Sequence, residues 1–178
     1  GPVRFRFDER ISERVSSGAL ESAVLVSPRT GEVEVNHNRQ SLEVGLVGGF
    51  EVGRVYRITL LPVVGDLFGN RTRDPFELVF STGPELTPTV VAGLVWDRTT
   101  GQGVSELEVL ARSAEDSTVH LARTDTGGIY AFRYLPPGSY RLEAFQDQNR
   151  NQEVDAMEVQ GGSRILLGAG DTLLTDVG

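Results

Sequence analysis

The stretch 119-VHLARTDTGGIYAFRYLPPGSYRLEAF-145 decides the fold. It contains three short runs rich in β-branched and aromatic residues, which is the composition that strands have. These runs are residues 119–123, 129–132 and 140–145. Asp125-Thr126-Gly127-Gly128 separates the first two, and Pro136-Pro137-Gly138 precedes the third, where two fixed φ angles are followed by a Gly that tolerates positive φ. The stretch therefore predicts consecutive strands joined by tight turns.

The same pattern continues in both directions along the chain. Residues 3–7 alternate apolar and arginine side chains, the period of two expected of a sheet with one buried face. Other short runs bounded by turn residues lie at 24–26, 33–35, 42–44, 55–61, 76–80, 90–96, 107–111, 165–167 and 173–177. Only residues 11–21 suggest a helical turn, and Ser16-Ser17-Gly18 interrupts them. Many short strands with frequent turns predict an all-β sandwich.

A change of composition marks a boundary near the middle of the chain. Residues 81–89 contain two prolines and no periodic apolar face, which is typical of a short stiff linker. We therefore expect two tandem sandwiches of the immunoglobulin-like or prealbumin-like class, residues 1–84 and 90–178, joined by a linker at 85–89.

Composition excludes several classes of protein. The 178 residues include no Cys, and all 17 basic residues are Arg. Disulfide scaffolds, zinc-cysteine sites, Cys nucleophiles and Lys Schiff bases are thereby excluded. A formal charge of -8 with scattered arginines argues against nucleic-acid binding. No apolar run is long enough to span a bilayer.

The start of the sequence suggests that the chain is a piece of a longer protein. It has no initiator Met, and Gly1-Pro2 is what a protease-cleavage scar leaves. A signal peptide or a lipid anchor would then lie outside these residues.

Both halves resemble families of bacterial surface domains. Residues 3–83 resemble a bacterial immunoglobulin-like domain, and residues 90–178 resemble a carboxypeptidase-regulatory-like or collagen-adhesin B-type β-sandwich. The residues that carry the first resemblance are the opening Val3-x-Phe5-x-Phe7 strand, Gly53-x-x-Tyr56-x-Ile58-x-Leu60, Asp66-x-x-Gly69-Asn70 and Phe80-Ser81-Thr82-Gly83. Those that carry the second are Gly93-x-Val95-x-Asp97, Thr124-Asp125-x-x-Gly128-x-Tyr130-x-Phe132 and Leu135-Pro136-Pro137-Gly138-x-Tyr140.

The resemblance implies an exported bacterial protein whose sandwiches act as spacers, supports or adhesive modules. Some collagen-adhesin B-type domains stiffen themselves with a Lys-Asn isopeptide bond. This chain has no Lys and cannot form one. Its mechanical stability is therefore expected to come from burial and hydrogen bonding, to which a bound metal could add.

One segment has the spacing of a metal site. From Asp147 to Glu158, oxygen-bearing side chains fall at relative positions one, three, five, seven, nine and twelve, the spacing with which an EF-hand-type loop surrounds calcium. The predicted ligands are Asp147, Asn149, Asn151, Glu153, Asp155 and Glu158. Position six is Gln152 where that motif has Gly, and the segment follows a predicted strand, so no helix pair is implied. The alternative is an acidic loop that is simply solvated.

Enzyme hypotheses find less support in the sequence. The two histidines, His37 and His120, fall in different predicted domains, and we expect both at the surface or at a strand edge. No Gly-x-Ser-x-Gly or Gly-x-Gly-x-x-Gly motif occurs, and no spacing selects a carboxylate pair. The Asp66 and Asp125 segments are interpreted as turns. Among the aromatic residues, Tyr56, Tyr130 and Tyr140 are expected in cores or tyrosine corners, and Trp96 and Tyr134 at the surface.

Together with these patterns, the resemblance implies a non-catalytic structural or adhesive module of an exported bacterial surface protein, stabilised by calcium. The protein would be extracellular, at the cell surface or periplasmic, with a protein or glycan partner. The alternative function is a carbohydrate-binding module or an accessory domain of a larger secreted enzyme. Self-association through strand edges, at Val90-Val91-Ala92 or Leu173-Leu174, is a further hypothesis.

Overall fold

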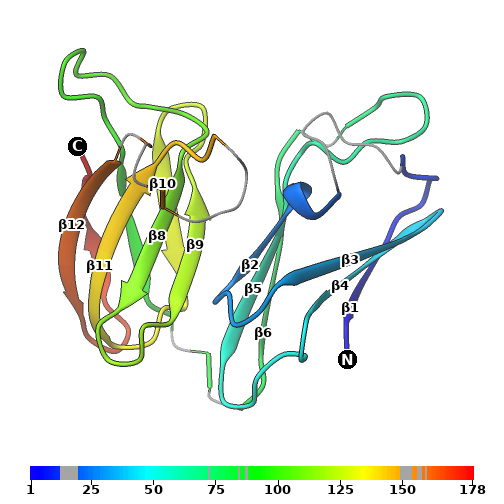
Figure 1. The fold of residues 1–178 in the computed structure, drawn as a ribbon, viewed down its shortest axis with the longest axis horizontal. Helices are drawn as coiled ribbons and strands as arrows, with labels where there is room; N and C mark the ends of the chain where they lie inside the picture. Colours follow the sequence, from blue (N-terminus) through cyan, green and yellow to red (C-terminus); the bar gives the residue numbers. More distant parts are fainter. Residues whose placement is uncertain are drawn as a thin grey trace. The chain divides into compact units, whose positions relative to one another are not determined.

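The computed structural model describes residues 1–12, 20–71, 73–83, 85–86, 88–148, 154–155, 158 and 160–178. The chain divides into two compact units, Gly1–Pro84 and Glu85–Gly178, which are called unit 1 and unit 2. Each consists of short strands with almost no helix (Figure 1). The predicted all-β, immunoglobulin-like class is confirmed.

Unit 1 contains two three-stranded sheets, β1-β4-β3 and β2-β5-β6, in which neighbouring strands are antiparallel. The strands are β1 (Val3–Arg6), β2 (Val24–Ser27), β3 (Val33–Asn38), β4 (Ser41–Leu46), β5 (Val55–Leu60) and β6 (Phe76–Ser81). Along β4, Leu42, Val44 and Leu46 are buried and alternate with half-buried residues, as the period of two requires. They pack against apolar residues of the facing sheet, including Val26 and Ile58.

The described helical structure of unit 1 is one short 3-10 helix. The 3-10 helix η1 (Leu20–Ala23) follows residues 13–19, which lie outside the described residues. Ile11, where the predicted helical turn begins, instead pairs with Asp66 in an isolated antiparallel bridge. The helical turn predicted at 11–21 is thus not found at Ile11 and overlaps η1 at Leu20 and Glu21, and residues 13–19 of the prediction lie outside the described residues.

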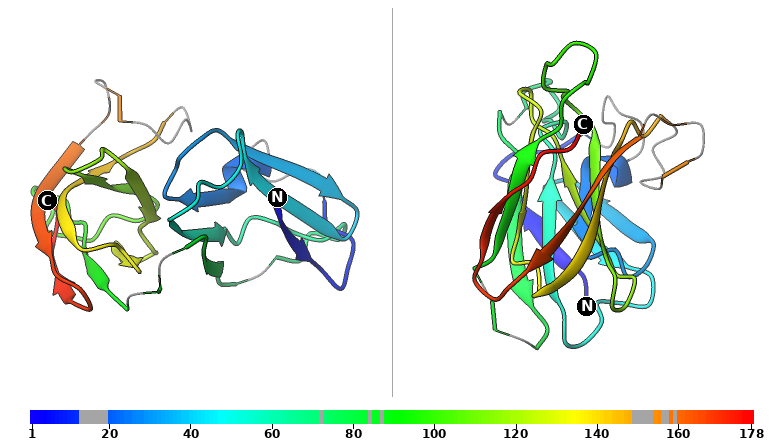
Figure 2. Two further views of the ribbon diagram at one scale, coloured as in Figure 1. Left: turned by 90° about the horizontal axis from the view of Figure 1, so that it is seen from below. Right: turned by 90° about the vertical axis from the view of Figure 1, so that its left-hand side faces the viewer.

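Unit 2 is a sandwich of one three-stranded sheet, β10-β7-β13, and one four-stranded sheet, β12-β11-β8-β9 (Figures 1 and 2). Its strands are β7 (Val90–Leu94), β8 (Glu108–Ser113), β9 (Val119–Arg123), β10 (Ile129–Arg133), β11 (Gly138–Phe145), β12 (Gln160–Leu167) and β13 (Thr172–Leu174). All neighbouring strands are antiparallel except β7 and β13, which run parallel.

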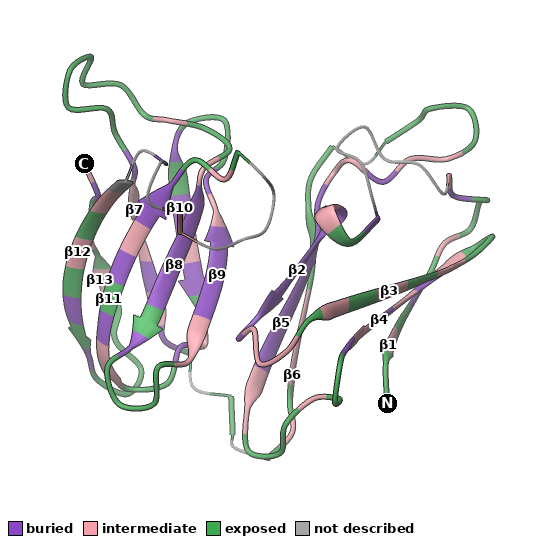
Figure 3. Cartoon of the chain, in the orientation of Figure 1, coloured by how far each residue is buried: buried purple, intermediate pink, exposed green. Residues whose placement is uncertain are grey.

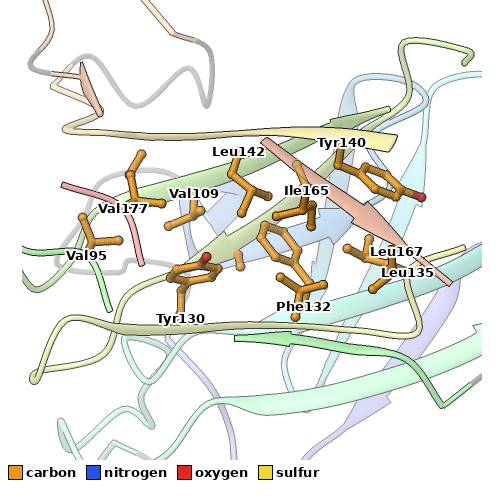
Figure 4. Packing of buried hydrophobic residues seen from close by; sticks show 14 residues of the cluster. Val95, Val109, Tyr130, Phe132, Leu135, Tyr140, Leu142, Ile165, Leu167 and Val177 are labelled. Atoms are coloured by element: carbon orange, nitrogen blue, oxygen red, sulfur yellow. The ribbon is translucent and has the colours of Figure 1, made fainter. Parts of the chain in front are cut away.

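The core of unit 2 lies between its two sheets. Figure 4 shows Phe132 from β10 pointing toward Leu142 of β11 and Ile165 of β12. Figure 3 shows buried residues concentrated along β8, β9 and β11 of this unit and along β2 and β5 of unit 1. In each unit, the apolar face of one sheet packs against the apolar face of the other, which is how a sandwich removes apolar surface from water.

The expected buried tyrosines are all found in the cores. Tyr56 and Tyr130 are 0% and 1% exposed, and the Tyr140 side chain is also buried. The Tyr140 hydroxyl donates to the Pro136 carbonyl at 2.8 Å, four residues upstream, as a tyrosine corner does. Trp96 is exposed as expected, but Tyr134 is half-buried.

The two predicted Asp turns are also confirmed. Asp66 Oδ1 accepts hydrogen bonds from the amides of Phe68 and Asn70, each at 2.8 Å. Asp125 Oδ1 accepts from Gly127 at 2.8 Å and from Ile129 at 2.9 Å. Because the carboxylates serve the backbone of their own turns, turn formation accounts for these residues.

Candidate functional site

The predicted calcium segment joins β11 to β12 at one end of the four-stranded sheet. The register of β11 places Phe145, its last residue, opposite Glu108 of β8 and Gln160 of β12. Glu108 in turn lies opposite Arg123, the last residue of β9. The start of β8 and the ends of β9 and β11 therefore meet where the segment begins (Figure 1).

A small apolar cluster holds part of this segment against the outer face of the sheet. Leu110, Leu121 and Phe145 are at most 1% exposed and form a cluster separate from the main core of unit 2, with Val119 and Val154 packed against it. Alternation along the strands points these side chains away from the main core. Val154, which belongs to the predicted calcium segment, thus covers a face of the sheet that solvent would otherwise reach.

Glu158 closes the segment with its carboxylate. Its side chain is buried, at 9% exposure, and its Oε1 accepts a hydrogen bond from the Gln148 amide at 3.0 Å. Its Oε2 accepts from the Asp155 amide at 3.2 Å, and its own amide donates to the Asp155 carbonyl at 3.1 Å. Glu158 therefore ties the first residues of the segment to the last.

The predicted ligand set is only partly within the described residues. Asp147, Asp155 and Glu158 are described, whereas Asn149, Asn151 and Glu153 lie outside the described residues. Within the described part of the chain, no group of three His, Cys, Asp or Glu side chains is placed so that it could hold a metal ion. Calcium binding by this segment remains a prediction.

Glu108, at the base of the segment, is a buried carboxylate that the sequence analysis missed. It is 6% exposed, and its Oε1 lies 3.7 Å from Arg123 Nε, beyond hydrogen-bond distance. Its Oε2 has no hydrogen-bond partner. Burial raises the pKa of Glu108 to about 7, the Arg123 charge opposes this rise, and the Asp147 charge adds to it. The site therefore combines an incompletely paired carboxylate with a second carboxylate close enough to repel it.

The burial of Glu108 could have been predicted from Leu110, which lies two residues further along the same strand. Glu108 and Leu110 share the outer face of β8, and a large apolar side chain on that face indicates that something covers it. A charged residue at the start of a strand is usually solvated, whereas the side chain of Glu108 is buried.

The histidines were expected at the surface or at a strand edge. His120 lies in β9, an edge strand of the four-stranded sheet, but its side chain is 5% exposed and its ring lies 6.0 Å from that of Tyr140, so the edge position holds and the surface position does not. His37 lies in strand β3, half-buried, with Nε2 3.1 Å from the Ile11 carbonyl oxygen. The two belong to different units and have separate local partners.

A second feature of unit 2 is the pairing of its first and last strands. β13 runs parallel to β7, with Thr172 opposite Val90 and Leu174 opposite Ala92 (Figure 2). Backbone hydrogen bonds extend this pairing, from Val90 N to Asp171 O at 2.9 Å as far as Trp96 N to Val177 O at 3.0 Å. We call this paired region, residues 90–96 with 171–177, the terminal clamp.

Near Gly93, side chains take part in the backbone pairing of the terminal clamp. The Thr175 carbonyl turns toward Gly93, where an added Cβ would lie 1.8 Å from its oxygen, and accepts a hydrogen bond from the Tyr130 hydroxyl. The Leu94 amide is bonded to Asp176 Oδ1 at 2.9 Å. Burial, and then the Asp176 charge, raise the pKa of Tyr130, so its hydroxyl keeps the proton that it donates. These two hydrogen bonds connect the core residue Tyr130 and strand β7 to the C-terminal segment.

The terminal clamp also corrects a prediction about strand edges. β7 has β10 on one side and β13 on the other, so Val90-Val91-Ala92 is a central strand and cannot add a partner strand. In this sheet β13, which includes Leu173-Leu174, is an edge strand.

Sequence comparison finds that most of unit 2 is similar to a known family model. Residues 90–167 match the model of the carboxypeptidase regulatory-like domain. A comparison with curated proteins gave no match. No helix in the described part of the chain has the length and apolar character that a bilayer crossing requires.

Several solved structures show a distant likeness. A candidate carbohydrate-binding protein from Pseudomonas aeruginosa has 12% identity and a TM-score of 0.36, covering 52% of this chain and 90% of that chain. The major pilin subunit of Bacillus cereus has 10% identity and a TM-score of 0.33, covering 89% and 57%. The T6 backbone pilin of Streptococcus pyogenes has 7% identity and a TM-score of 0.31, covering 90% and 41%.

Proposed function

We propose that this chain is a non-catalytic structural module of an exported bacterial surface protein, and that unit 2 transmits force between its two ends. The observation that carries the proposal is the terminal clamp, in which the first and last strands of unit 2 are parallel neighbours. The match of residues 90–167 to a family of regulatory-like domains agrees with a role other than catalysis. Export, surface location and a lipid anchor outside these residues belong to the same proposal.

The direction of the two strands decides how they respond to tension. A pull on the linker draws β7 toward its N-terminus, and a pull on Gly178 draws β13 toward its C-terminus. Because the strands are parallel, they must slide past each other, and the hydrogen bonds from Val90 to Val177 are loaded together. Bonds loaded one after another break at lower force, because the unfolding rate governs forced unfolding and each step has a smaller barrier.

Two pulling directions on the full chain test this role. The chain has no Cys, so single-molecule tethers can be attached through introduced cysteines alone. A tether between the chain termini loads the terminal clamp in shear, whereas Pro88→Cys with Ala169→Cys places both tethers at its Asp171 end and opens it bond by bond. We expect a higher unfolding force for unit 2 in the first geometry. Equal forces in the two geometries would remove the load-bearing role.

We also propose that a structural calcium ion braces unit 2 through Asp147, Asn149, Asn151, Glu153, Asp155 and Glu158. Carboxylate, amide and carbonyl oxygens are the donors that calcium prefers. The unpartnered Oε2 of Glu108 supports an ion at this end of the sheet. With a dissociation constant of about 10⁻⁴ M and calcium about tenfold above it, the ion would stabilise unit 2 by about 1.4 kcal/mol. A stabilisation of this size is enough to hold one loop in place.

Calcium titration against thermal unfolding tests the brace. We expect calcium to raise the melting temperature of the unit 2 transition in the wild type and in Glu85→Ala, a matched loss of charge outside the loop. Asp147→Ala should show little or no rise, because one of the ligands is absent. A wild-type transition that calcium leaves unchanged, or the same shift in Asp147→Ala, would exclude the brace.

A carbohydrate-binding role, the alternative function, would need an exposed aromatic platform. Trp96 is the exposed aromatic side chain of unit 2, at 36% exposure. Its ring packs against Gly178, where an added Cβ would lie 2.8 Å from Trp96 Cε2, so it closes the end of the terminal clamp. Glycan binding that Trp96→Ala abolishes would favour the alternative over the structural role.

A further inference from the structure

Three arginines of unit 2 lie side by side on the outer face of the four-stranded sheet. The antiparallel register places Arg141 of β11 opposite Arg112 of β8 on one side and opposite Arg164 of β12 on the other. Each arginine is next along its strand to a residue of the main core of unit 2, so alternation directs its side chain away from that core, and all three are exposed. Neighbouring strands are about 5 Å apart, so the three residues form a continuous row across the sheet, which we call the arginine row.

The arginine row is unfavourable for the fold on its own. Like charges directly opposite each other on neighbouring strands destabilise a sheet. Glu143, on the same face of β11, places its Oε1 3.0 Å from Arg141 Nε. Within the described part of the chain, Arg112 and Arg164 have no carboxylate partner. The row therefore keeps an excess of positive charge, in a chain whose formal charge is -8.

The direction of the row limits what can bind to it. The row crosses the strands, and its central strand β11 is hydrogen-bonded to β8 and β12 along both sides (Figure 1). A peptide that adds a strand must pair with an edge of the sheet and run along it, so it would reach one arginine at most. A ligand that contacts all three arginines must lie across the strands and present several anionic groups to side chains.

Charge density favours an acidic polysaccharide over a nucleic acid. Double-stranded DNA carries one negative charge for about every 1.7 Å of its axis, so a chain with a formal charge of -8 repels it. An acidic polysaccharide carries its carboxylate or sulfate groups on separate sugar units, so the repulsion is weaker. A guanidinium group can donate two parallel hydrogen bonds to a carboxylate or a similar oxyanion, which suits arginine to this recognition.

We propose that the arginine row binds an acidic polysaccharide, which lies across β8, β11 and β12 and pairs its carboxylate or sulfate groups with the guanidinium groups. The bound anions offset the repulsion between the arginines. The row is on the sheet of unit 2 that does not contain the terminal clamp, so this binding is independent of the load-bearing role. It depends on charge, and it therefore differs from the aromatic platform at Trp96 that a neutral glycan would need.

Binding of the full chain to immobilised polygalacturonate and dextran sulfate tests the proposal. Methyl-esterified polygalacturonate and plain dextran are the uncharged counterparts. We expect at least one charged polymer to bind and neither uncharged polymer to do so, and the charged polymer that binds identifies the anionic group. Arg112→Gln and Arg164→Gln should each weaken binding about threefold, the contribution of one exposed ion pair, and together about tenfold.

Two further variants separate the arginine row from the general charge of the chain. Arg133→Gln is the matched control, because it removes an exposed arginine from β10 in the other sheet, about 10 Å away. It should change binding by less than about 1.5-fold at physiological salt, where charges are screened beyond about 8 Å. Glu143→Gln removes the carboxylate that competes for Arg141, so it should bind the polymer more tightly than the wild type.

Melting without polymer serves as the folding control. Arg112→Gln and Arg164→Gln should melt at or above the wild-type temperature, because the repulsion between neighbouring strands is reduced. A clearly lower melting temperature in both variants would contradict the proposal, because the arginines would then stabilise the fold themselves.

The binding outcomes decide between the possible partners. Weaker binding by Arg112→Gln and Arg164→Gln, together with tighter binding by Glu143→Gln, supports the proposal. Failure of both charged polymers to bind the wild type, or an equal loss in Arg133→Gln, would overturn it. Polyglutamate that binds as tightly as the charged polysaccharides, with the same losses in the variants, would assign the arginine row to an acidic peptide instead.

Discussion

At the scale of single residues, Gly93 has the clearest structural requirement in the chain. It lies in β7, and the Thr175 carbonyl approaches its Cα so closely that an added Cβ would be 1.8 Å from the oxygen. The same carbonyl accepts the Tyr130 hydroxyl proton. Glycine is therefore required at position 93, because the Thr175 backbone leaves no room for a side chain. A clash with a main-chain atom cannot be relieved by a change of rotamer.

Gly93→Ala should consequently destabilise unit 2 by about 3 kcal/mol, because the C-terminal segment must move to admit the methyl group. Gly45→Ala, in strand β4 of unit 1, is the matched control. Its Cβ would lie 3.6 Å from Pro2 Cβ, an ordinary contact, so its effect should stay within about 1 kcal/mol. Chemical denaturation of both variants provides the measurement. Similar losses at the two sites would show that the approach of Thr175 is not rigid.

Other single residues differ in how well the sequence predicts them. Tyr140 was predictable, because a Tyr within a strand is expected in the core or in a tyrosine corner, and its hydroxyl reaches the Pro136 carbonyl. His120 and Glu108 were not, because each is polar within a strand and its burial depends on what packs over that strand. Such covering comes from residues far away in the sequence.

At the scale of elements, the sequence pattern predicted where the strands lie but did not predict which strands pair. β9, β10 and β11 follow the turns around Asp125 and Gly138 closely. β12 begins at Gln160, earlier than the predicted 165, because Gly161 and Gly162 give no apolar signal yet pair with β11. The parallel pairing of β7 with β13 joins segments separated by most of unit 2, and local propensity carries no information about it.

The covering of the sheet by Val154 gives a prediction for the loop. Val154→Ala should destabilise unit 2 by about 1 kcal/mol, because two methyl groups leave the contact with Leu110 and Phe145. Val52→Ala, at a site 89% exposed in unit 1, should change stability by less than about 0.5 kcal/mol. Denaturant midpoints of the two unfolding transitions measure both effects. A Val154→Ala variant as stable as Val52→Ala would show that the loop does not pack on the sheet in solution.

At the scale of the whole molecule, the two units differ in how their ends are held. In unit 2, the first and last strands are direct neighbours in one sheet. In unit 1, β1 and β6 belong to different sheets and share no backbone pairing. Sequence analysis predicted two sandwiches in tandem but gave no reason to expect this difference, since it depends on which strands become neighbours.

The difference between the units allows the central claim to be tested in one recording. The full chain is held at its two termini and extended, so that both units experience the same force and unit 1 serves as the internal reference. Unit 2 spans 94 residues and unit 1 spans 84, by the bounds Glu85–Gly178 and Gly1–Pro84, so the lengths released identify each step. The account predicts that the longer step, from unit 2, occurs at the higher force. Opening of unit 2 at the same force as unit 1, or below it, would contradict the claim that the terminal clamp carries load.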